Sequence, residues 1–198
     1  MLELSQAKVQ VYEYDLVSKS HWGYGVWQDE PDRAEWKSHD LLCLIVRHDR
    51  GYLQGFVGVS YGASLWGMSA EEARRLGIAV HRGIEYAAPD RSVPLSVVSP
   101  FAGDVTAKLY HVPSEPRRGA TWFLGFHCNQ EPATDQPGDF SPDDTLAEAR
   151  PTLRRVYRTY SYAHGEVERL AVQLANQSLQ TKLAALRRSV TVDDGSQR

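Results

Sequence analysis

Histidine and cysteine side chains stand at the predicted ends of two strands. His81 begins one apolar run, and His127 and Cys128 end another. A thiol beside an imidazole is the minimum apparatus for nucleophilic catalysis by cysteine. Because consecutive strand residues point to opposite faces of a sheet, His127 cannot be the base for Cys128, and His81 would have to serve. One hypothesis is therefore a hydrolase with Cys128 as nucleophile or His81 as general base; the alternative is a core thiol and a surface histidine.

Acidic residues gather in a proline-bearing loop over 129–151. They are Glu131, Asp135, Asp139, Asp143 and Asp144. Carboxylate oxygens are ligands for divalent cations, and a metal at Asp135 and Asp139 would assist hydrolysis. The loop has no EF-hand pattern, and acidic runs in such loops are usually only solvated. The sequence therefore does not settle whether the protein binds a metal or a cofactor.

A loop rich in glycine and aromatic residues is predicted over 61–67, before a capped helix. The glycine-rich stretch from Gly51 to Gly67, which includes this loop, lacks a P-loop lysine and the Gly-x-Gly-x-x-Gly spacing, so a turn, a bulge or close packing explains its glycines better. Backbone N–H groups and aromatic faces in such a loop suit a small anionic or heterocyclic ligand. The residues predicted to bind a ligand come from this loop, nearby strand ends and the acidic loop: Tyr61, Trp66, His81, Gly83, Tyr86, Trp122, His127 and Asp139.

The elements that position these residues are mostly strands. The clearest signal predicts a hairpin of strands 41–48 and 52–60, with Gly51 in its turn. Ser69, followed by two glutamates, predicts the start of a short helix that stops at Gly77. The remaining predicted strands are 8–14, 80–86, 105–111 and 121–128, the last a central strand, while 18–40 is predicted as a loop.

The C-terminal part is predicted to be one helix from Pro151 to Arg188. Apolar residues recur at three- and four-residue steps from Leu153 to Leu186. A helix of roughly 35 residues is about 50 Å long, more than a domain of this size can cover. Its last turns should therefore pack on a second subunit or fray. The basic residues assigned to its solvent face are Arg154, Arg155, Arg158 and Arg169.

The fold class predicted from these elements is α+β, a mostly antiparallel sheet with one long C-terminal helix and one short helix. Residues 1–188 are expected to form a single domain, followed by a polar tail over 189–198. The 198 residues carry 22 basic and 25 acidic side chains, and a net charge of −3 disfavours extended nucleic acid as a partner. No signal peptide or membrane span is expected, which predicts a cytoplasmic protein with reduced thiols.

Short blocks over roughly residues 41–175 resemble a family of uncharacterised proteins common in bacteriophage and prophage genomes. The blocks are Gly51-Tyr52-Leu53-x-Gly55-Phe56-Val57-Gly58-Val59, Leu65-Trp66-Gly67, His81-x-Gly83-Ile84-x-Tyr86, Trp122-Phe123-x-Gly125-Phe126-x-Cys128 and Tyr157-Arg158-Thr159. The family pattern reads Phe-Asp-Cys-x-His where this chain has Phe126-His127-Cys128-Asn129-Gln130, so an aspartate and a histidine are missing. Gly138-Asp139 corresponds to a later Gly-Asp of the family, displaced by an insertion.

These departures favour a binding pocket over a strict catalytic constellation. The resemblance implies no activity, but its phage setting suggests an accessory role in the host cytoplasm, such as sequestering a nucleotide signal of host immunity. The favoured prediction is thus a protein that binds a small polar or nucleotide-like ligand. We expect it to form a homo-oligomer. The alternatives are the hydrolase and an interaction protein that pairs through its long helix.

Overall fold

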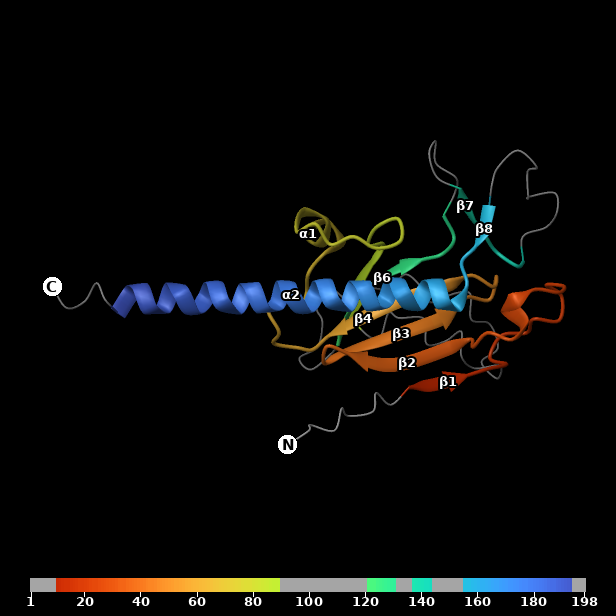
Figure 1. Ribbon diagram of the computed structural model, residues 1–198, viewed down its shortest axis with the longest axis horizontal. Helices are drawn as coiled ribbons and strands as arrows, with labels where there is room; N and C mark the ends of the chain where they lie inside the picture. The colour runs from red at the N-terminus through yellow and green to blue at the C-terminus, as the bar shows by residue number, and fades with distance from the viewer. Residues whose placement is uncertain (1–9, 90–120, 131–136, 144–154, 194–198) are drawn as a thin grey trace, which may run out of the picture.

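The computed structural model describes residues 10–89, 121–130, 137–143 and 155–193. These residues form a six-stranded sheet that is crossed on one face by a long C-terminal helix, α2 (Tyr160–Asp193) (Figure 1). A short helix, α1 (Ala70–Arg75), and a separate two-stranded sheet lie at its margins. The predicted α+β class, with a mostly antiparallel sheet and two unequal helices, is confirmed.

The sheet has the strand order β1-β2-β3-β4-β6-β5, and every neighbouring pair is antiparallel. Its strands are β1 (Val11–Glu13), β2 (Arg33–Ser38), β3 (Leu41–Arg47), β4 (Leu53–Val59), β5 (Tyr86–Pro89) and β6 (Trp122–His127). The apolar strand β6 lies between β4 and β5, as the sequence predicts. The predicted strand over 105–111 lies outside the described residues.

Two tight turns set the register of the first half of the sheet. The predicted hairpin of β3 and β4 is present, and Gly51 has the positive φ of 93° that its turn requires. The β2–β3 turn places His39 and Asp40 at φ values of 52° and 61°, and two successive positive φ values are typical of a type I′ hairpin turn. The predicted loop over 18–40 is therefore wrong at its C-terminal end, where β2 forms; a 3₁₀ turn lies earlier in the segment, at Val26–Gln28.

A predicted strand over 80–86 is also wrong, because the chain turns within it. Arg82 and Gly83 both have positive φ, of 57° and 107°, and the Gly83 N–H donates to the Val80 carbonyl over 3.0 Å. Such a turn interrupts an extended backbone, so β5 begins only at Tyr86.

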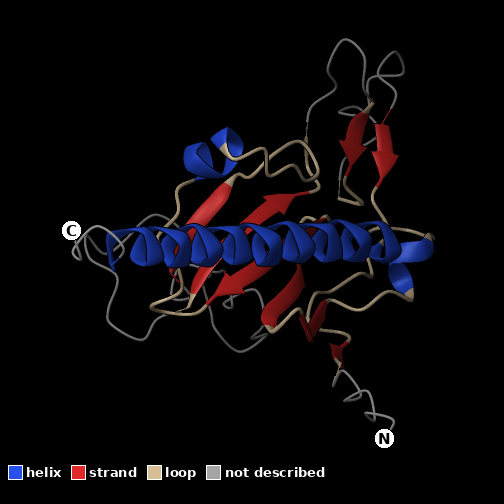
Figure 2. Cartoon of the chain, turned by 60° about the vertical axis from the view of Figure 1, so that its left-hand side comes forward, coloured by secondary structure: helices blue, strands red, loops and turns tan. Residues whose placement is uncertain are grey.

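The N-terminal half of α2 covers the strands on one face of the sheet (Figure 2). Its buried face carries Ala163, Val167, Leu170, Ala171 and Leu174 at three- and four-residue steps. Gly55 of β4 makes this approach possible, because a Cβ there would stand 2.5 Å from Phe126 and 2.6 Å from Val167.

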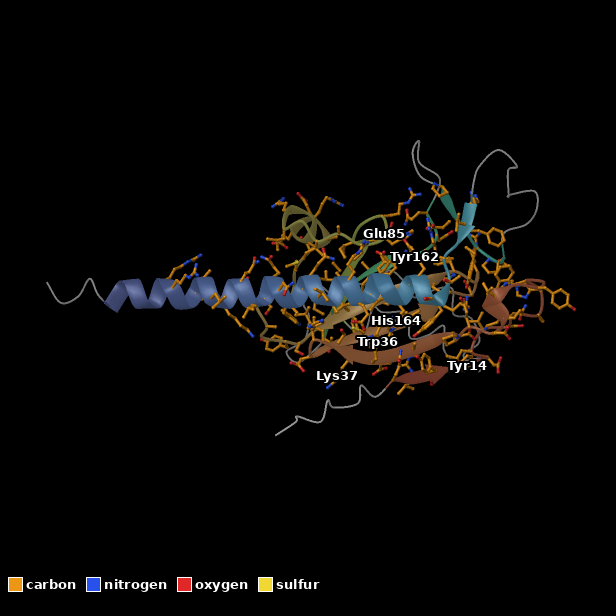
Figure 3. The ribbon with its side chains drawn as sticks, in the orientation of Figure 1. Tyr14, Trp36, Lys37, Glu85, Tyr162 and His164 are labelled. Atoms are coloured by element: carbon orange, nitrogen blue, oxygen red, sulfur yellow. The ribbon has the colours of Figure 1, made fainter. Side chains whose placement is uncertain are left out.

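Polar contacts fix α2 along β2. The Trp36 indole N–H donates to Oε1 of Glu168 over 2.6 Å, and the Ser38 hydroxyl donates to Oε2 over 2.6 Å. His164 stacks on Trp36 with ring centroids 4.5 Å apart (Figure 3). Because both contacts come from successive turns of the helix, they fix its rotation as well as its distance from the sheet.

A buried ionic group holds the start of α2. Arg47 is fully buried and donates to Asp32 over 2.8 Å, to Glu30 over 3.1 Å and to the Tyr157 hydroxyl over 2.7 Å. Glu30 also accepts from the Tyr160 backbone N–H over 2.7 Å, at the first turn of the helix. The buried Arg47 cation is thus paired and hydrogen-bonded to two acids, as burial of charge requires.

The predicted helix therefore starts too early. Residues Arg155–Tyr157 form a strand, β8, which pairs in parallel with β7 (Gly138–Phe140) in the separate small sheet. Only Arg169 of the four predicted solvent-face arginines is described on the helix; Arg155 lies in β8, Arg158 follows it, and Arg154 lies outside the described residues. The bond from Arg47 to Tyr157 anchors this segment in an extended form.

The short helix α1 forms as predicted. Ser69 accepts from the Glu72 backbone N–H, and Glu72 accepts from the Ser69 backbone N–H, which completes a capping box. Glu72 has a pKa below its ordinary value, because these bonds from Ser69 favour the carboxylate. Gly77, with a φ of 74°, ends the helix.

Candidate functional site

The turn of residues 80–83 carries His81 into the protein interior. His81 is 5% exposed, and both of its ring nitrogens have a partner. Nε2 lies 2.7 Å from Oδ2 of Asp139, and Nδ1 lies 2.8 Å from the hydroxyl of Tyr162. With Asp139 ionised, Nε2 carries the hydrogen of the His81–Asp139 bond, because a carboxylate only accepts.

Asp139 is the centre of this group. Arg158 Nε donates to its Oδ1 over 2.8 Å, and the Gln130 backbone N–H donates to its Oδ2 over 2.9 Å. Burial opposes ionisation of Asp139, but the bonds from His81, Arg158 and Gln130 outweigh it and lower its pKa. Asp139 is therefore a carboxylate at neutral pH.

Arg158 closes the group on its outer side. Its guanidinium carbon lies 4.8 Å from the centroid of the Tyr162 ring, a cation–π contact. Tyr162 lies in the first turn of α2 (Figure 3). Burial and the nearby Glu166 raise the pKa of Tyr162, so its hydroxyl stays protonated. We call His81, Asp139, Arg158 and Tyr162 the histidine cluster; it joins the 80–83 turn, β7 and the start of α2.

Cys128 does not have the properties of a nucleophile. It is 1% exposed, and burial, with the negative charge of Asp139 next in effect, raises its pKa well above the ordinary value. A buried protonated thiol is inert, because the thiolate is the reactive form. Cys43 is also buried, and both cysteines are free thiols.

The remaining predicted ligand-binding residues fall in different places. Tyr61, Trp66 and Trp122 lie together on the α2 face, with the ring centroid of Trp66 4.9 Å from that of Tyr61 and 5.8 Å from that of Trp122. Tyr86 packs against Phe56 on the opposite face of the sheet.

His127 alternates with the helix-facing residues Phe126 and Cys128, and lies 3.5 Å from Glu85. Burial lowers the pKa of His127, so its ring is neutral at pH 7. Gly83 serves the turn that buries His81. The eight residues therefore do not line one cavity.

A hollow of about 450 Å³ lies between α1, the loop before it and α2. We call it the α1–α2 hollow; its lining combines one aromatic side chain, several apolar side chains, and charged or polar groups from both helices. Its lining residues are Ser64, Leu65, Trp66, Gly67, Met68, Glu72, Arg75, Leu76, Gln177 and Thr181.

The polar groups of the hollow are more exposed than those of the histidine cluster, and Arg75 and Thr181 have partners on their own helices. Arg75 pairs with Glu71 of its own helix, and the side chains of both are about two-thirds exposed. Thr181 donates to the Gln177 carbonyl over 2.9 Å, so its hydroxyl hydrogen is used within the helix and its oxygen can still accept a hydrogen bond. Exposed ion pairs contribute little stability, so Arg75 can exchange partners for an anion at small cost.

No metal site is evident in the described part of the chain. No group of three or more histidine, cysteine, aspartate or glutamate side chains is arranged there to hold an ion. Asp139 is committed to His81 and Arg158, and Asp143 lies 3.2 Å from His21. Asp135, the other predicted ligand, lies outside the described residues. Within those residues, no helix is long and apolar enough to cross a bilayer.

Sequence reasoning missed two members of the histidine cluster, Arg158 and Tyr162. The apolar spacing continues through residue 158 and so predicts a solvent-facing helical position for Arg158. A Thr159 side chain that accepts from the Tyr162 backbone N–H marks the true helix start, and a threonine at this position is the signal that could have found it.

Comparisons with known proteins give no further guide to function. The chain matches no protein family model, no curated protein and no solved structure. The resemblance to phage proteins therefore stays a prediction.

Proposed function

We propose that this protein binds a small polar or nucleotide-like ligand in the α1–α2 hollow. The observation that carries the proposal is the composition of the hollow: the Trp66 ring stands with Arg75 and with the amide and hydroxyl groups of Gln177 and Thr181 around one volume of about 450 Å³. Ligand sites of small molecules typically combine an aromatic or apolar wall with a few converging polar groups.

The ligand class follows from these groups. A heterocyclic base can stack on the Trp66 ring, and such stacking contributes about 1–3 kcal/mol per base. A phosphate can pair with Arg75, whose guanidinium presents several donors in one plane. Gln177 offers both a donor and acceptors, although its side chain and Thr181 do not by themselves select one base.

Binding is favoured over hydrolysis by the state of the predicted catalytic pair. Cys128 is buried and protonated, and His81 has both nitrogens occupied within the protein. The two free cysteines are in keeping with a reducing compartment, and we place the protein in the cytoplasm. A counter-defence role rests on the phage resemblance and stays a prediction.

Calorimetric titration with adenosine 5′-monophosphate (AMP) and with adenosine tests the proposal. We expect AMP to bind, and adenosine to bind more weakly because it lacks the phosphate. Thr181→Trp fills the hollow and should weaken AMP binding at least tenfold.

Ala184→Trp is the matched control, because Ala184 is exposed on the same helix and does not line the hollow. Its affinity should equal that of the wild type. Equal affinity in the Thr181→Trp variant would show that AMP binds elsewhere, and no heat with either ligand would refute the nucleotide-like class.

A further inference from the structure

The second half of α2 extends beyond the sheet. Leu174 is the last buried side chain on the helix among those described, and every described side chain from Leu179 to Ala185 is exposed. Figure 1 shows this part of α2 projecting past the strands and past α1. We call residues 175–193 the α2 extension.

An apolar seam follows the outer side of α2 and continues onto the extension. Val172, Asn176, Leu179 and Leu183 succeed one another at steps of four, three and four residues. The three apolar members are 39%, 57% and 45% exposed. At about 100° per residue they lie within about 60° of one another and roughly opposite the face that packs on the sheet.

This spacing is that of the a and d positions of a coiled coil, with Asn176 and Leu183 at a and Val172 and Leu179 at d. One polar asparagine among apolar a and d residues fixes register and partner number in such pairs. No other element of the described chain covers these three exposed apolar side chains, so the seam fits a second helix with the same spacing.

The charges of α2 select the direction of pairing. From residue 170 to residue 188 the chain has Lys182, Arg187 and Arg188 and no acidic residue, whereas Glu166 and Glu168 precede that stretch. In a parallel pair, Lys182 of one copy would face Arg187 of the other, which is repulsive. In an antiparallel pair, Lys182 of each copy instead lies opposite Ala175 of the other, so this repulsion does not arise.

We propose that two copies of this chain pair antiparallel along the seam. Val172 of one copy packs against Leu183 of the other, and Asn176 packs against Leu179. The twofold axis then passes between residues 177 and 178. The two Asn176 amides come about 4.5 Å apart along the axis, close enough to hydrogen-bond to each other.

Sedimentation velocity over a range of concentrations tests the pairing. The wild type should be a dimer at tens of micromolar, and the double variant Leu179→Glu/Leu183→Glu should have a dimer dissociation constant at least tenfold higher. Ala184→Glu/Ala185→Glu is the control, because it adds the same charge at exposed positions off the seam. A monomeric wild type at 100 micromolar, or a dimer that survives the seam variant, would overturn the proposal.

Cysteine cross-linking tests the direction. When Val172→Cys and Leu183→Cys single variants are mixed and oxidised, we expect disulfides between the two kinds of chain. The Leu183→Cys variant alone should give none, because its two copies are far apart in an antiparallel pair. Efficient self-cross-linking of Leu183→Cys would indicate parallel pairing and overturn the assignment. Circular dichroism of each variant checks that the helix is intact.

Discussion

The histidine cluster and the α1–α2 hollow differ in how far their polar groups are satisfied. In the cluster, His81 and Asp139 are buried and their bonds close within the protein: Nε2 to Asp139, Nδ1 to Tyr162, and Oδ1 to Arg158. In the hollow, Arg75 is exposed and pairs along its own helix.

This difference separates a structural role for the cluster from the binding role proposed for the hollow. The cluster contains the residue types of catalysis, yet it joins a turn, a strand and a helix start in the manner of a buried ionic anchor. The hollow contains ordinary residue types, yet it has volume and groups that can change partner. Judged by residue types alone, the histidine cluster would be the better candidate for a functional site. Judged by accessibility to a ligand, the hollow is the better candidate.

The largest expected effect is on stability, at the centre of the cluster. Asp139→Ala leaves His81 and Arg158 without their carboxylate, and loss of one partner of a buried ion pair costs about 3–5 kcal/mol. The free energy of unfolding from urea denaturation measures this. Thr181→Ala in the hollow should change it by no more than about 0.5 kcal/mol.

A loss of less than about 1 kcal/mol in Asp139→Ala would break the comparison, because the cluster would then not anchor the fold. His81→Gln, which keeps a hydrogen-bonding group at the position, should lose less free energy of unfolding than Asp139→Ala. The difference between the two variants shows whether the charge of the carboxylate or the packing of the imidazole contributes more to stability.

The second effect is on ligand affinity, at the wall of the hollow. Trp66→Ala removes a stacking surface worth about 1–3 kcal/mol, which corresponds to about 5- to 150-fold weaker AMP binding. Trp66→Phe should retain most of the affinity, since a ring remains. Calorimetry gives both values, and thermal unfolding without ligand checks that the variants fold. Unchanged affinity in Trp66→Ala would remove the case for stacking.

A third prediction concerns the free energy of unfolding at acid pH, where protonation of Asp139 weakens the histidine cluster. Because the pKa of Asp139 is lowered in the folded state, its contribution to stability is complete above its unfolded value near 4. That contribution disappears as pH falls through the folded pKa. Asp139→Asn should therefore lose part of the acid dependence of stability below pH ~4.

Urea denaturation between pH 2.5 and pH 6 measures this dependence. Glu71→Gln, at an exposed position near the hollow, should keep the wild-type slope. Identical slopes for Asp139→Asn and the wild type would show that Asp139 does not gain stability from ionisation.

The smallest effect concerns Arg75. Arg75→Ala should weaken AMP binding by about two- to fivefold and leave adenosine binding unchanged, because an exposed ion pair contributes about 0.5–1 kcal/mol. The ratio of the two affinities is the quantity to compare. A loss of equal size for both ligands would indicate a packing role for Arg75 and weaken the phosphate assignment.

Local signals account for what could be predicted from the sequence. The β3–β4 hairpin follows from two apolar runs around Gly51, and α1 follows from Ser69 and Glu72 at capping-box spacing. The excess length of the C-terminal helix also follows from its periodicity, and α2 does run past the sheet. Each of these depends on residues within one or two turns of one another.

The parts that could not be predicted depend on contacts between distant residues. Asp139 and His81 are 58 positions apart, and their contact requires both the Arg82–Gly83 turn and the β7–β8 pairing. Tyr157 is extended because its hydroxyl accepts from Arg47, 110 residues earlier. No local apolar pattern shows that the helix must start at residue 160, which leaves Arg158 outside the helix where it can bond to Asp139.

The strand β2 could be predicted only in part, because its sequence signal is present but weak. Arg33 to Ser38 alternates inward and outward as a strand should, with Ala34, Trp36 and Ser38 buried. The alternation is short, and it follows Pro31 in a stretch rich in loop-forming residues. The turn after it is His39-Asp40 rather than a glycine turn, so the usual hairpin signal is absent.

Hydrogen–deuterium exchange with and without AMP tests most directly whether the hollow, and not the histidine cluster, is the binding site. We expect slower exchange in peptides that cover residues 64–76 and 177–181 when AMP is present, with no change over 78–84 and 137–143. Protection confined to the cluster peptides would contradict binding in the hollow, and so would equal exchange everywhere at saturating AMP.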